Sequence, residues 1–133
     1  TNPQNWVIMR YADVLLMVSE LGGVPSKSAQ AALDEVRARA GLNSIAATKD
    51  NILAERAVEL AFEGHRYWDL LRQGVDVLAD AIVASAGDVT NGGTPGSVTF
   101  DKNLIIEKQG LSQIPRDQII LSNGVLKQNP GWN

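Results

Sequence analysis

Helix-length segments with apolar periodicity, separated by glycines, follow one another over the first part of the chain. This pattern predicts helices at about residues 6–21, 26–40, 48–64, 65–73 and 75–84. Apolar residues recur every three or four positions in each segment, which is the spacing of one helix face. Gly22 and Gly23 can take the left-handed conformation that closes a last helical turn, Gly41 is a helix stop signal, and Gly74 interrupts the pattern. The sequence therefore predicts an all-α fold of antiparallel helical hairpins, with a core over about residues 6–84.

The first predicted helix, from Trp6 to Leu21, is apolar around almost its whole circumference. Only a narrow polar stripe of Arg10, Asp13 and Glu20 runs along it. A helix that is apolar on nearly all sides is typically packed on several sides. We therefore expect this helix to be packed on several of its sides.

Capping residues mark the starts of the next two helices. Ser26 or Ser28 precedes the second helix, and Thr48 precedes the third. Each hydroxyl can accept a hydrogen bond from a free backbone N–H of the first turn. The apolar face expected for the third helix consists of Leu53, Ala57, Leu60 and Ala61. The opposite face is expected to carry three acidic residues, Glu55, Glu59 and Glu63.

The chain changes character after residue 84. Glycine, proline and small polar residues dominate residues 85–103, which predicts a long surface loop with a short hairpin around residues 98–100. Residues 104–133 are expected to form an extended tail that contains a short strand or extended piece, followed by a helical turn over residues 116–121. The whole chain, 133 residues of which 44% are hydrophobic, predicts a single helical domain. Because it opens on Thr1-Asn2-Pro3 without an initiator Met, we interpret it as a piece of a longer protein.

Composition excludes several classes of function. The net charge of −3 and the lack of a basic run argue against nucleic-acid binding. No apolar run is long enough to cross a membrane. The chain has no cysteine and a single histidine, His65, so neither a thiolate metal site nor a histidine-rich one is expected. No cofactor motif is present, and we predict neither metal nor cofactor.

The densest group of charges predicts a structural ion-pair network. Its members are Glu55, Arg56, Glu59, Glu63, Arg66, Asp69 and Arg72. Carboxylates at positions i, i+4 and i+8 of one helix repel one another, so they need cationic partners if they are buried. Further guanidinium groups are available at Arg10, Arg37 and Arg39. We expect these pairs to clamp neighbouring helices in one register.

Two alternatives assign a function to residues of this kind. Glu59 and Glu63 could form the acid/base pair of a glycoside hydrolase, which needs two carboxylates facing each other across a sugar. Neighbours on one helix usually point side by side, so the structural role is favoured. Trp132 is a weak candidate for stacking on a sugar ring, because it lies in a tail rich in glycine and proline. Trp68 and Trp6 are expected to pack inside the fold.

Four motifs, in order and spread over almost the whole chain, resemble the SusD/RagB family. They are RYADVLLMVSE at 10–20, VRARAGL at 36–42, ERAVELAFEGHRYWDLLR at 55–72, and the pair QIPRDQI at 113–119 with LKQNPGW at 126–132. Four positions depart mildly from the family's pattern, which are Ser19, Gln113, Gln118 and Trp132. Because the motifs occur together in the family's order, the resemblance is specific.

The resemblance implies a function that the residues alone do not show. Family members bind oligosaccharides or other nutrients without cleaving them and pair with a SusC-like TonB-dependent transporter. They are held on the external face of the outer membrane of Bacteroidota by an N-terminal lipid anchor, which this chain lacks. Their helices include tetratricopeptide-like pairs. The chain then corresponds to the C-terminal helical scaffold, with ligand-binding residues largely upstream. An alternative is a helical interaction module that contacts the transporter.

Overall fold

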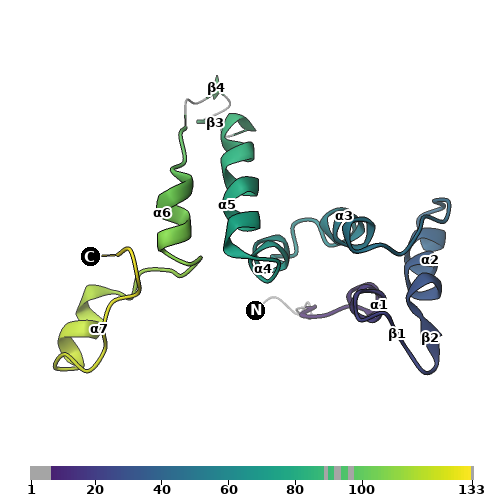
Figure 1. The fold of residues 1–133 in the computed structure, drawn as a ribbon, viewed down its shortest axis with the longest axis horizontal. Helices are drawn as coiled ribbons and strands as arrows, with labels where there is room; N and C mark the ends of the chain where they lie inside the picture. Colours follow the sequence, from purple (N-terminus) through teal and green to yellow (C-terminus); the bar gives the residue numbers. More distant parts are fainter. Residues whose placement is uncertain (1–6, 89, 92–93, 96–97, 133) are drawn as a thin grey trace, which may run out of the picture. The chain divides into compact units, whose positions relative to one another are not determined.

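The computed structural model describes residues 7–88, 90–91, 94–95 and 98–132, and these residues are mostly helical (Figure 1). The prediction of an all-α fold is confirmed, because the strands are limited to short two-residue pairs. The chain divides into two compact units, residues 1–66 and 67–133, and each is described by itself. That the two units form a single domain stays a prediction.

The first unit is built on a helical hairpin, in which a short strand pair connects two helices that are in contact. Its elements in chain order are α1 (Tyr11–Glu20), β1 (Gly23–Val24), β2 (Lys27–Ser28), α2 (Ala29–Arg39) and α3 (Lys49–Glu59). The strands pair antiparallel, with Gly23 opposite Ser28 and Val24 opposite Lys27. Helix α1 packs against both α2 and α3. The core between them consists of Ala12, Leu15, Leu16, Ala32, Leu33, Val36, Ile52 and Leu60.

Local hydrogen bonds close the helix ends as the sequence predicts. The Ser28 hydroxyl accepts from the backbone N–H of Ala31, and the Thr48 hydroxyl accepts from that of Asn51. Gly41 takes a φ of +70° just after α2, and the N–H of the next residue, Leu42, reaches back to the carbonyl of Arg37. These bonds satisfy backbone groups that a helix end leaves without an internal partner.

Helix α1 begins later than predicted and is open on one side. Its first residue is Tyr11, because Arg10 is extended and provides no side-chain cap. Trp6 lies outside the described residues. Val7, Ile8 and Met9 precede the helix and are 59–83% exposed. Helix α1 is packed on more than one side, as expected, because it contacts both α2 and α3, whereas Tyr11 and Val14 of the helix are 62% and 37% exposed.

Helix α3 ends earlier than predicted, and its buried face differs from the expected one. The helix stops at Glu59, whereas the prediction placed its end near Gly64. Its buried residues are Ile52, Glu55 and Arg56, so charged side chains point inward. The physical reason is that each buried charge pairs with an opposite charge on another helix, Arg56 with Asp13 of α1 and Glu55 with Arg37 of α2.

The second unit holds short helices and one further strand pair. Its elements are α4 (Arg66–Leu71), which begins at the unit boundary, α5 (Val75–Ala84), the 3₁₀ turn η1 (Ser85–Asp88), β3 (Thr90–Asn91), β4 (Thr94–Pro95), α6 (Lys102–Glu107) and α7 (Arg116–Leu121). Helix α6 packs against α5, where Leu78 and Ala79 are buried. A Lys102–Asp80 ion pair of 2.5 Å also joins the two helices.

The structure differs from the prediction at two places in this unit. The strand pair lies at residues 90–95, whereas it was expected around residues 98–100. The helix α6, at the start of the expected tail, was not predicted, whereas the helical turn expected over residues 116–121 is α7. Asp101 caps α6 by accepting from the N–H groups of Asn103 and Leu104. A cap of this kind favours helix over strand, although the segment is rich in β-branched residues.

Candidate functional site

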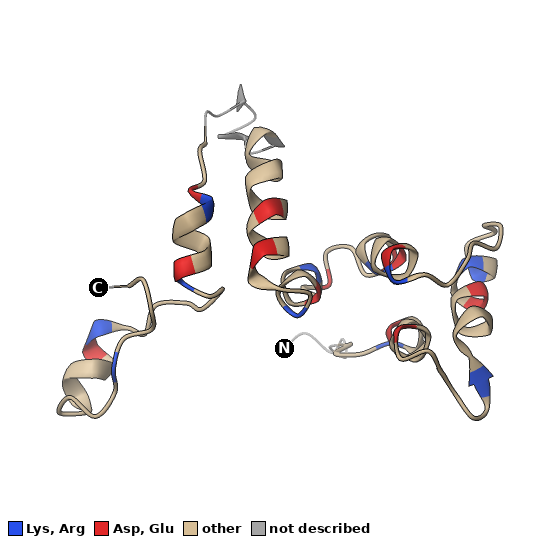
Figure 2. Cartoon of the chain, viewed as in Figure 1, with Lys and Arg blue, Asp and Glu red and all other residues tan. Residues whose placement is uncertain are grey.

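The first unit carries a network of ion pairs at the meeting point of α1, α2 and α3. Figure 2 marks acidic positions on α1 and both acidic and basic positions on α2 and α3. Asp13 of α1 accepts a hydrogen bond of 2.8 Å from Nη1 of Arg56 on α3. Only 6% and 5% of these two side chains are exposed. A buried pair of this kind holds two helices in register, because either partner alone would be a buried, unpaired charge.

Glu55 links α3 to α2. One carboxylate oxygen lies 2.5 Å from Nη1 of Arg37, and the side chains of Glu55 and Arg37 are 9% and 15% exposed. The Nε of Arg37 donates to the backbone carbonyl of Asn43 at 2.7 Å. Arg37 therefore binds both Glu55 of α3 and the backbone of the segment that connects α2 to α3.

Glu59 lies between two guanidinium groups. Nη1 of Arg10 donates to its Oε1 at 2.5 Å, and Nη2 of Arg39 donates to both carboxylate oxygens at 2.8 Å. Arg10 also donates to the backbone carbonyl of Glu59, at the C-terminal end of α3. A cation is favourable there, since the helix dipole places partial negative charge at that end. The Glu59 side chain is 8% exposed.

The protonation of this group follows from its hydrogen bonds. Burial alone would raise the pKa of Glu59, but hydrogen bonds from Arg10 and Arg39 outweigh it and hold that pKa below its ordinary value. The hydrogen bond to Glu59 likewise raises the pKa of Arg10 above its ordinary value, in spite of partial burial. Glu59 is therefore an anion at neutral pH and cannot serve there as a general acid.

Glu63 shares the same arginine. Nε of Arg10 lies 2.8 Å from one Glu63 oxygen and 2.9 Å from the other, and the Glu63 side chain is 37% exposed. Glu59 and Glu63, the alternative acid/base pair, are thus both hydrogen-bonded to one guanidinium group. This arrangement is typical of an ion-pair network, whereas a glycosidase keeps one of its two carboxyls protonated.

The other members of the predicted network occupy different settings. In the second unit, Asp69 is buried and accepts a hydrogen bond of 3.0 Å from Nη2 of Arg72, three residues along the chain. Arg66 is exposed. Sequence reasoning missed Asp13 as the partner of Arg56. The signal was an acidic residue between the apolar residues of the first helix, because such a residue is buried only if it is paired.

The tail that contains Trp132 folds back on the end of α6. The indole N–H of Trp132 donates to the carbonyl of Leu111 at 2.8 Å, and Nζ of Lys108 lies 3.7 Å from the ring centroid. Gln128 donates to the carbonyl of Ile114 and accepts from its N–H, both at 2.9 Å. The two C-terminal motifs are therefore hydrogen-bonded to each other, and Trp132 has a packing role in this unit.

Trp68 is not part of the core. Its side chain is 64% exposed, and its ring makes an edge contact with Tyr67 at a centroid distance of 5.2 Å. The expectation that Trp68 packs inside the fold is wrong. The hydroxyl of Tyr67 instead reaches the carbonyl of Gly110 at 2.5 Å, which ties α4 to the end of α6.

Two classes of site were also sought in the described part of the chain. None of its helices is long and apolar enough to cross a membrane. No group of three or more histidine and acidic side chains among the described residues is arranged to hold a metal ion.

Comparisons with known proteins agree with the motifs. The profile of the SusD family matches residues 1–132. The chain is 29% identical to the SusD-like protein P2 of Formosa agariphila, and the match takes in 96% of this chain and 26% of that protein. The chain thus spans about a quarter of the length of the curated relative it matches. No solved structure matches significantly. Since the family profile covers nearly every residue, the chain belongs to the SusD family.

Proposed function

We propose that the whole protein is the nutrient-binding component of a SusC/SusD-type outer-membrane uptake system, and that this chain is its helical scaffold. The observation that carries the proposal is the family match over residues 1–132. The geometry agrees with a scaffold, because the most buried charges bind one another across α1, α2 and α3. Charged side chains that are hydrogen-bonded to one another stabilise the fold and have few free donors or acceptors for a ligand.

The partners follow from the same proposal. The ligand is an oligosaccharide or another nutrient, bound mainly by residues outside this chain, and the acceptor is a SusC-like TonB-dependent transporter. The protein sits on the external face of the outer membrane, attached through an N-terminal lipid that lies outside residues 1–133. Capture and hand-over of the nutrient need no bond cleavage, so the protein is not an enzyme in this proposal.

Binding measurements on the full-length protein test this function. Calorimetry or a glycan array should detect an oligosaccharide or another nutrient that binds, with no product formed on long incubation. Failure to bind any nutrient class would count against the proposal.

The alternative, in which Glu59 and Glu63 catalyse glycoside hydrolysis, predicts that a product is formed. If these residues were catalytic, Glu59→Gln would abolish turnover and leave the melting temperature nearly unchanged. We expect the reverse, a lower melting temperature and no turnover even in the wild-type protein. Gln is a matched replacement because it keeps the shape of the side chain and removes only the charge that Arg10 and Arg39 bind.

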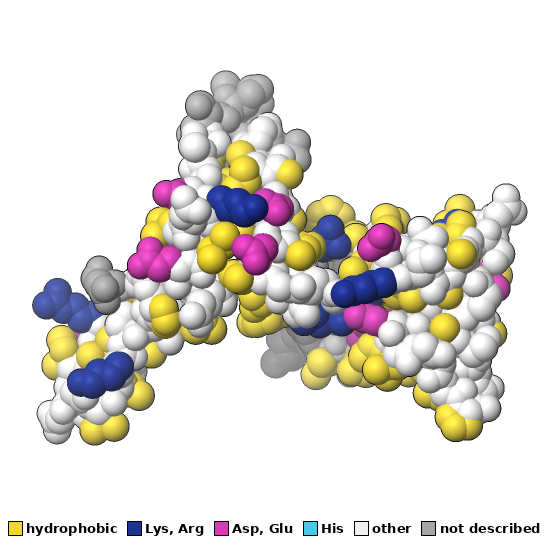
Figure 3. Space-filling view, viewed as in Figure 1, with side chains coloured by type: hydrophobic (Ala, Val, Ile, Leu, Met, Phe, Trp, Pro, Cys, Tyr) yellow, Lys and Arg dark blue, Asp and Glu magenta, His cyan; other side chains and the backbone are white. Residues whose placement is uncertain are grey.

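A second candidate function is an interaction module that contacts the transporter directly. Exposed apolar side chains favour it, since a monomeric soluble surface rarely gathers many of them. Val7 and Ile8 are 70% and 83% exposed, and Phe62 is fully exposed at a φ of +65°. Apolar side chains are visible on the surface in Figure 3. Replacement of Phe62 by Ser in the full-length protein should then weaken co-purification of the transporter and leave nutrient affinity unchanged.

A further inference from the structure

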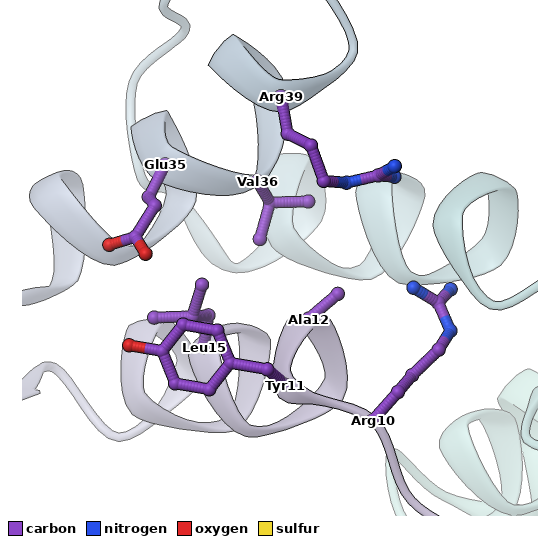
Figure 4. Close-up of a pocket in the computed structure, with 7 residues that line it drawn as sticks. All are labelled: Arg10, Tyr11, Ala12, Leu15, Glu35, Val36 and Arg39. Atoms are coloured by element: carbon purple, nitrogen blue, oxygen red, sulfur yellow. The ribbon is translucent and has the colours of Figure 1, made fainter. Parts of the chain in front are cut away.

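The charged side chains around the pocket of the first unit are already paired. This pocket, of about 380 Å³, lies at the seam between α1 and α2. The guanidinium groups of Arg10 and Arg39 lie together at one end (Figure 4), and both bind Glu59. Glu35, toward the other end, binds Lys27. Groups that are held in this way bond to one another rather than react, and the second unit offers a different setting.

Helix α7 of the second unit ends in a turn built on Asn123 and Gly124. Both residues take a positive φ, +52° and +78°, and the N–H of Val125 bonds to the carbonyl of Ser122 at 3.2 Å. These are the features of a type I′ turn, which favours Asn followed by Gly. The turn's hydrogen bond uses the N–H of Val125, so the N–H of Gly124 lies outside it. Asn123 is exposed, and a Cβ added to Gly124 would meet no atom within 4 Å.

We propose that Asn123 is a site of spontaneous deamidation. The backbone nitrogen of Gly124, after losing its proton to water, attacks Cγ of Asn123 and closes a succinimide ring, and no side chain on Gly124 hinders the approach. The bond from Cγ to Nδ2 breaks, and Nδ2 takes up a proton and leaves as ammonia. Water then opens the ring at either carbonyl, to give aspartate or isoaspartate. The net reaction consumes water, adds a negative charge to the chain and does not depend on the proposed function.

Other asparagines in the described part of the chain are held or blocked. Asn51 and Asn103 lie inside helices α3 and α6, where the backbone is fixed by hydrogen bonds. Asn129 precedes Pro130, which has no N–H and cannot attack in this way. The carbonyl of Asn43 accepts a hydrogen bond of 2.7 Å from an arginine side chain, which holds the peptide unit whose nitrogen would attack.

Helix α6 ends in a matching turn, with glutamine in place of asparagine. Gln109 and Gly110 have φ values of +52° and +68°, and the N–H of Leu111 bonds to the carbonyl of Lys108 at 2.8 Å. Glutamine has one more carbon in its side chain and would have to order a longer segment to close its ring, so its reaction is slower. The turn after α6 therefore shows that glutamine fits this position and suggests the control variant, Asn123→Gln.

Isoaspartate at position 123 would disturb the tail that follows. It routes the main chain through the former side chain and so lengthens the turn by one carbon atom. The tail is held by Gln128 on the backbone of Ile114 and by the indole of Trp132 on the carbonyl of Leu111. Limited digestion of the full-length protein after modification should therefore cut the tail of the wild type faster than that of Asn123→Gln. Equal rates would refute this consequence.

Peptide mapping of the full-length protein tests the site itself. Trypsin releases residues 117–127 as one peptide, in which Asn123 is the sole asparagine. The chain's other Asn-Gly pair, at residues 91–92, falls in the separate peptide of residues 73–102. After incubation in warm, mildly alkaline buffer, we expect residues 117–127 to gain about 1 Da, or about 3 Da in water enriched in heavy oxygen, because the new oxygen comes from water.

Two comparisons decide the outcome. A synthetic peptide of residues 117–127 sets the rate that the sequence alone allows. We expect the folded protein to react at no less than about one tenth of that rate, because an exposed turn needs little opening to react. Asn123→Gln should show no mass change over the same incubation. A slower reaction of the wild-type protein would overturn the proposal, and so would the same mass change in Asn123→Gln.

Discussion

At the residue scale, the first unit is organised by charges that are buried in pairs. Asp13, Glu55 and Arg56 are all less than 9% exposed. Among the described residues, no buried side-chain nitrogen or oxygen lacks a hydrogen-bond partner. A buried ion pair contributes less to stability than its Coulomb attraction suggests, but the loss of one partner is costly. Such pairs therefore act mainly on which helices meet and in which register.

Removal of a buried partner should destabilise the protein far more than removal of an exposed charge. We expect Arg56→Ala to lower the free energy of unfolding by about 3–5 kcal/mol, because Asp13 would remain buried without its partner. The control is Arg66→Ala, an exposed arginine on the neighbouring helix α4, with an expected loss of about 0–1 kcal/mol. Urea denaturation measures both. Equal losses would show that the buried pair contributes no more than an exposed charge.

Acid should weaken the same network through Glu59. The pKa of Glu59 is lower in the folded protein than its ordinary value of 4.5, so the folded state binds its anion more favourably than the unfolded state does. This contribution is complete above about pH 4.5 and is lost as the pH falls through the lowered pKa. Melting temperatures recorded from pH 7 to pH 3 should therefore fall more steeply for the wild type than for Glu59→Gln. If the melting temperatures of the wild type and of Glu59→Gln fell in parallel with pH, Glu59 would not be the source of the acid sensitivity.

At the element scale, short-range hydrogen bonds decide where helices begin. The second helix of the hairpin starts where the Ser28 hydroxyl accepts from the N–H of Ala31 at 3.1 Å. The same rule holds for Thr48 before α3 and Asp101 before α6. Where no capping side chain is present, as at Arg10, the position of the helix start depends on contacts with the rest of the unit.

The cap of α2 can be tested against a serine two residues away. Ser28→Ala should lower the free energy of unfolding by about 1 kcal/mol, since one N–H of the first turn loses its acceptor. Ser26→Ala is the matched control, because Ser26 is exposed and lies outside the helix start. Thermal unfolding of both variants gives the comparison. An equal effect at Ser26 would show that the cap itself contributes little.

In the second unit, a glycine allows α6 to end close to α4 and α5. Gly110 has a φ of +68°, and a Cβ added to it would lie 2.6 Å from Cδ1 of Leu71 and 3.3 Å from Cδ2 of Leu78. Gly124 has a similar φ of +78° but no atom within 4 Å of such a Cβ. A side chain at either position would therefore be strained by the left-handed backbone, but only a side chain at Gly110 would also clash with its neighbours.

This difference predicts the ranking of two alanine variants. Gly110→Ala should cost about 1–3 kcal/mol more than Gly124→Ala, because overpacking adds to the left-handed strain that both variants suffer. Denaturant unfolding of the two variants side by side measures the difference. If Gly124→Ala were as damaging as Gly110→Ala, the close approach to Leu71 would not be what makes a glycine necessary.

At the scale of the whole molecule, the chain combines a well-paired network with a large exposed apolar surface. In the first unit, internal charges are matched while Tyr11, Leu21 and Phe62 remain open to solvent. This combination is typical of a part that is completed by further protein, since exposed apolar patches mark interaction surfaces. It agrees with a match to only 26% of the curated relative.

The role of Trp132 also belongs to this scale. We expect Trp132→Ala in the full-length protein to reduce protection from proteolysis in the tail, because the indole loses both the Leu111 carbonyl and the cation of Lys108. Nutrient affinity should change little. A large loss of affinity with an unchanged digestion pattern would support the sugar-stacking alternative instead. Trp132→Phe is the control, since it keeps an aromatic face for Lys108 and removes only the N–H donor.

Local features of the fold could be read directly from the sequence. The limits of α5, the capping role of Thr48 and the helix stop at Gly41 were all predicted correctly, and Ser28 is one of the two serines that were expected to cap α2. Each depends on residues no more than a few positions apart, so the sequence alone contains the interaction. The need for arginine partners around Glu55 and Glu59 was also predictable, because a stripe of like charges is unfavourable without them.

Tertiary structure alone decided which partners meet. Glu59 pairs with Arg10 and Arg39, at separations of 49 and 20 residues, and Arg56 pairs with Asp13, 43 residues away. Residue type alone does not determine which arginine pairs with which carboxylate, because the chain has several arginines. The packing of α1, α2 and α3 determines the pairs. The same packing turned Glu55 and Arg56 inward, on a helix whose periodicity alone had assigned the buried face to apolar residues.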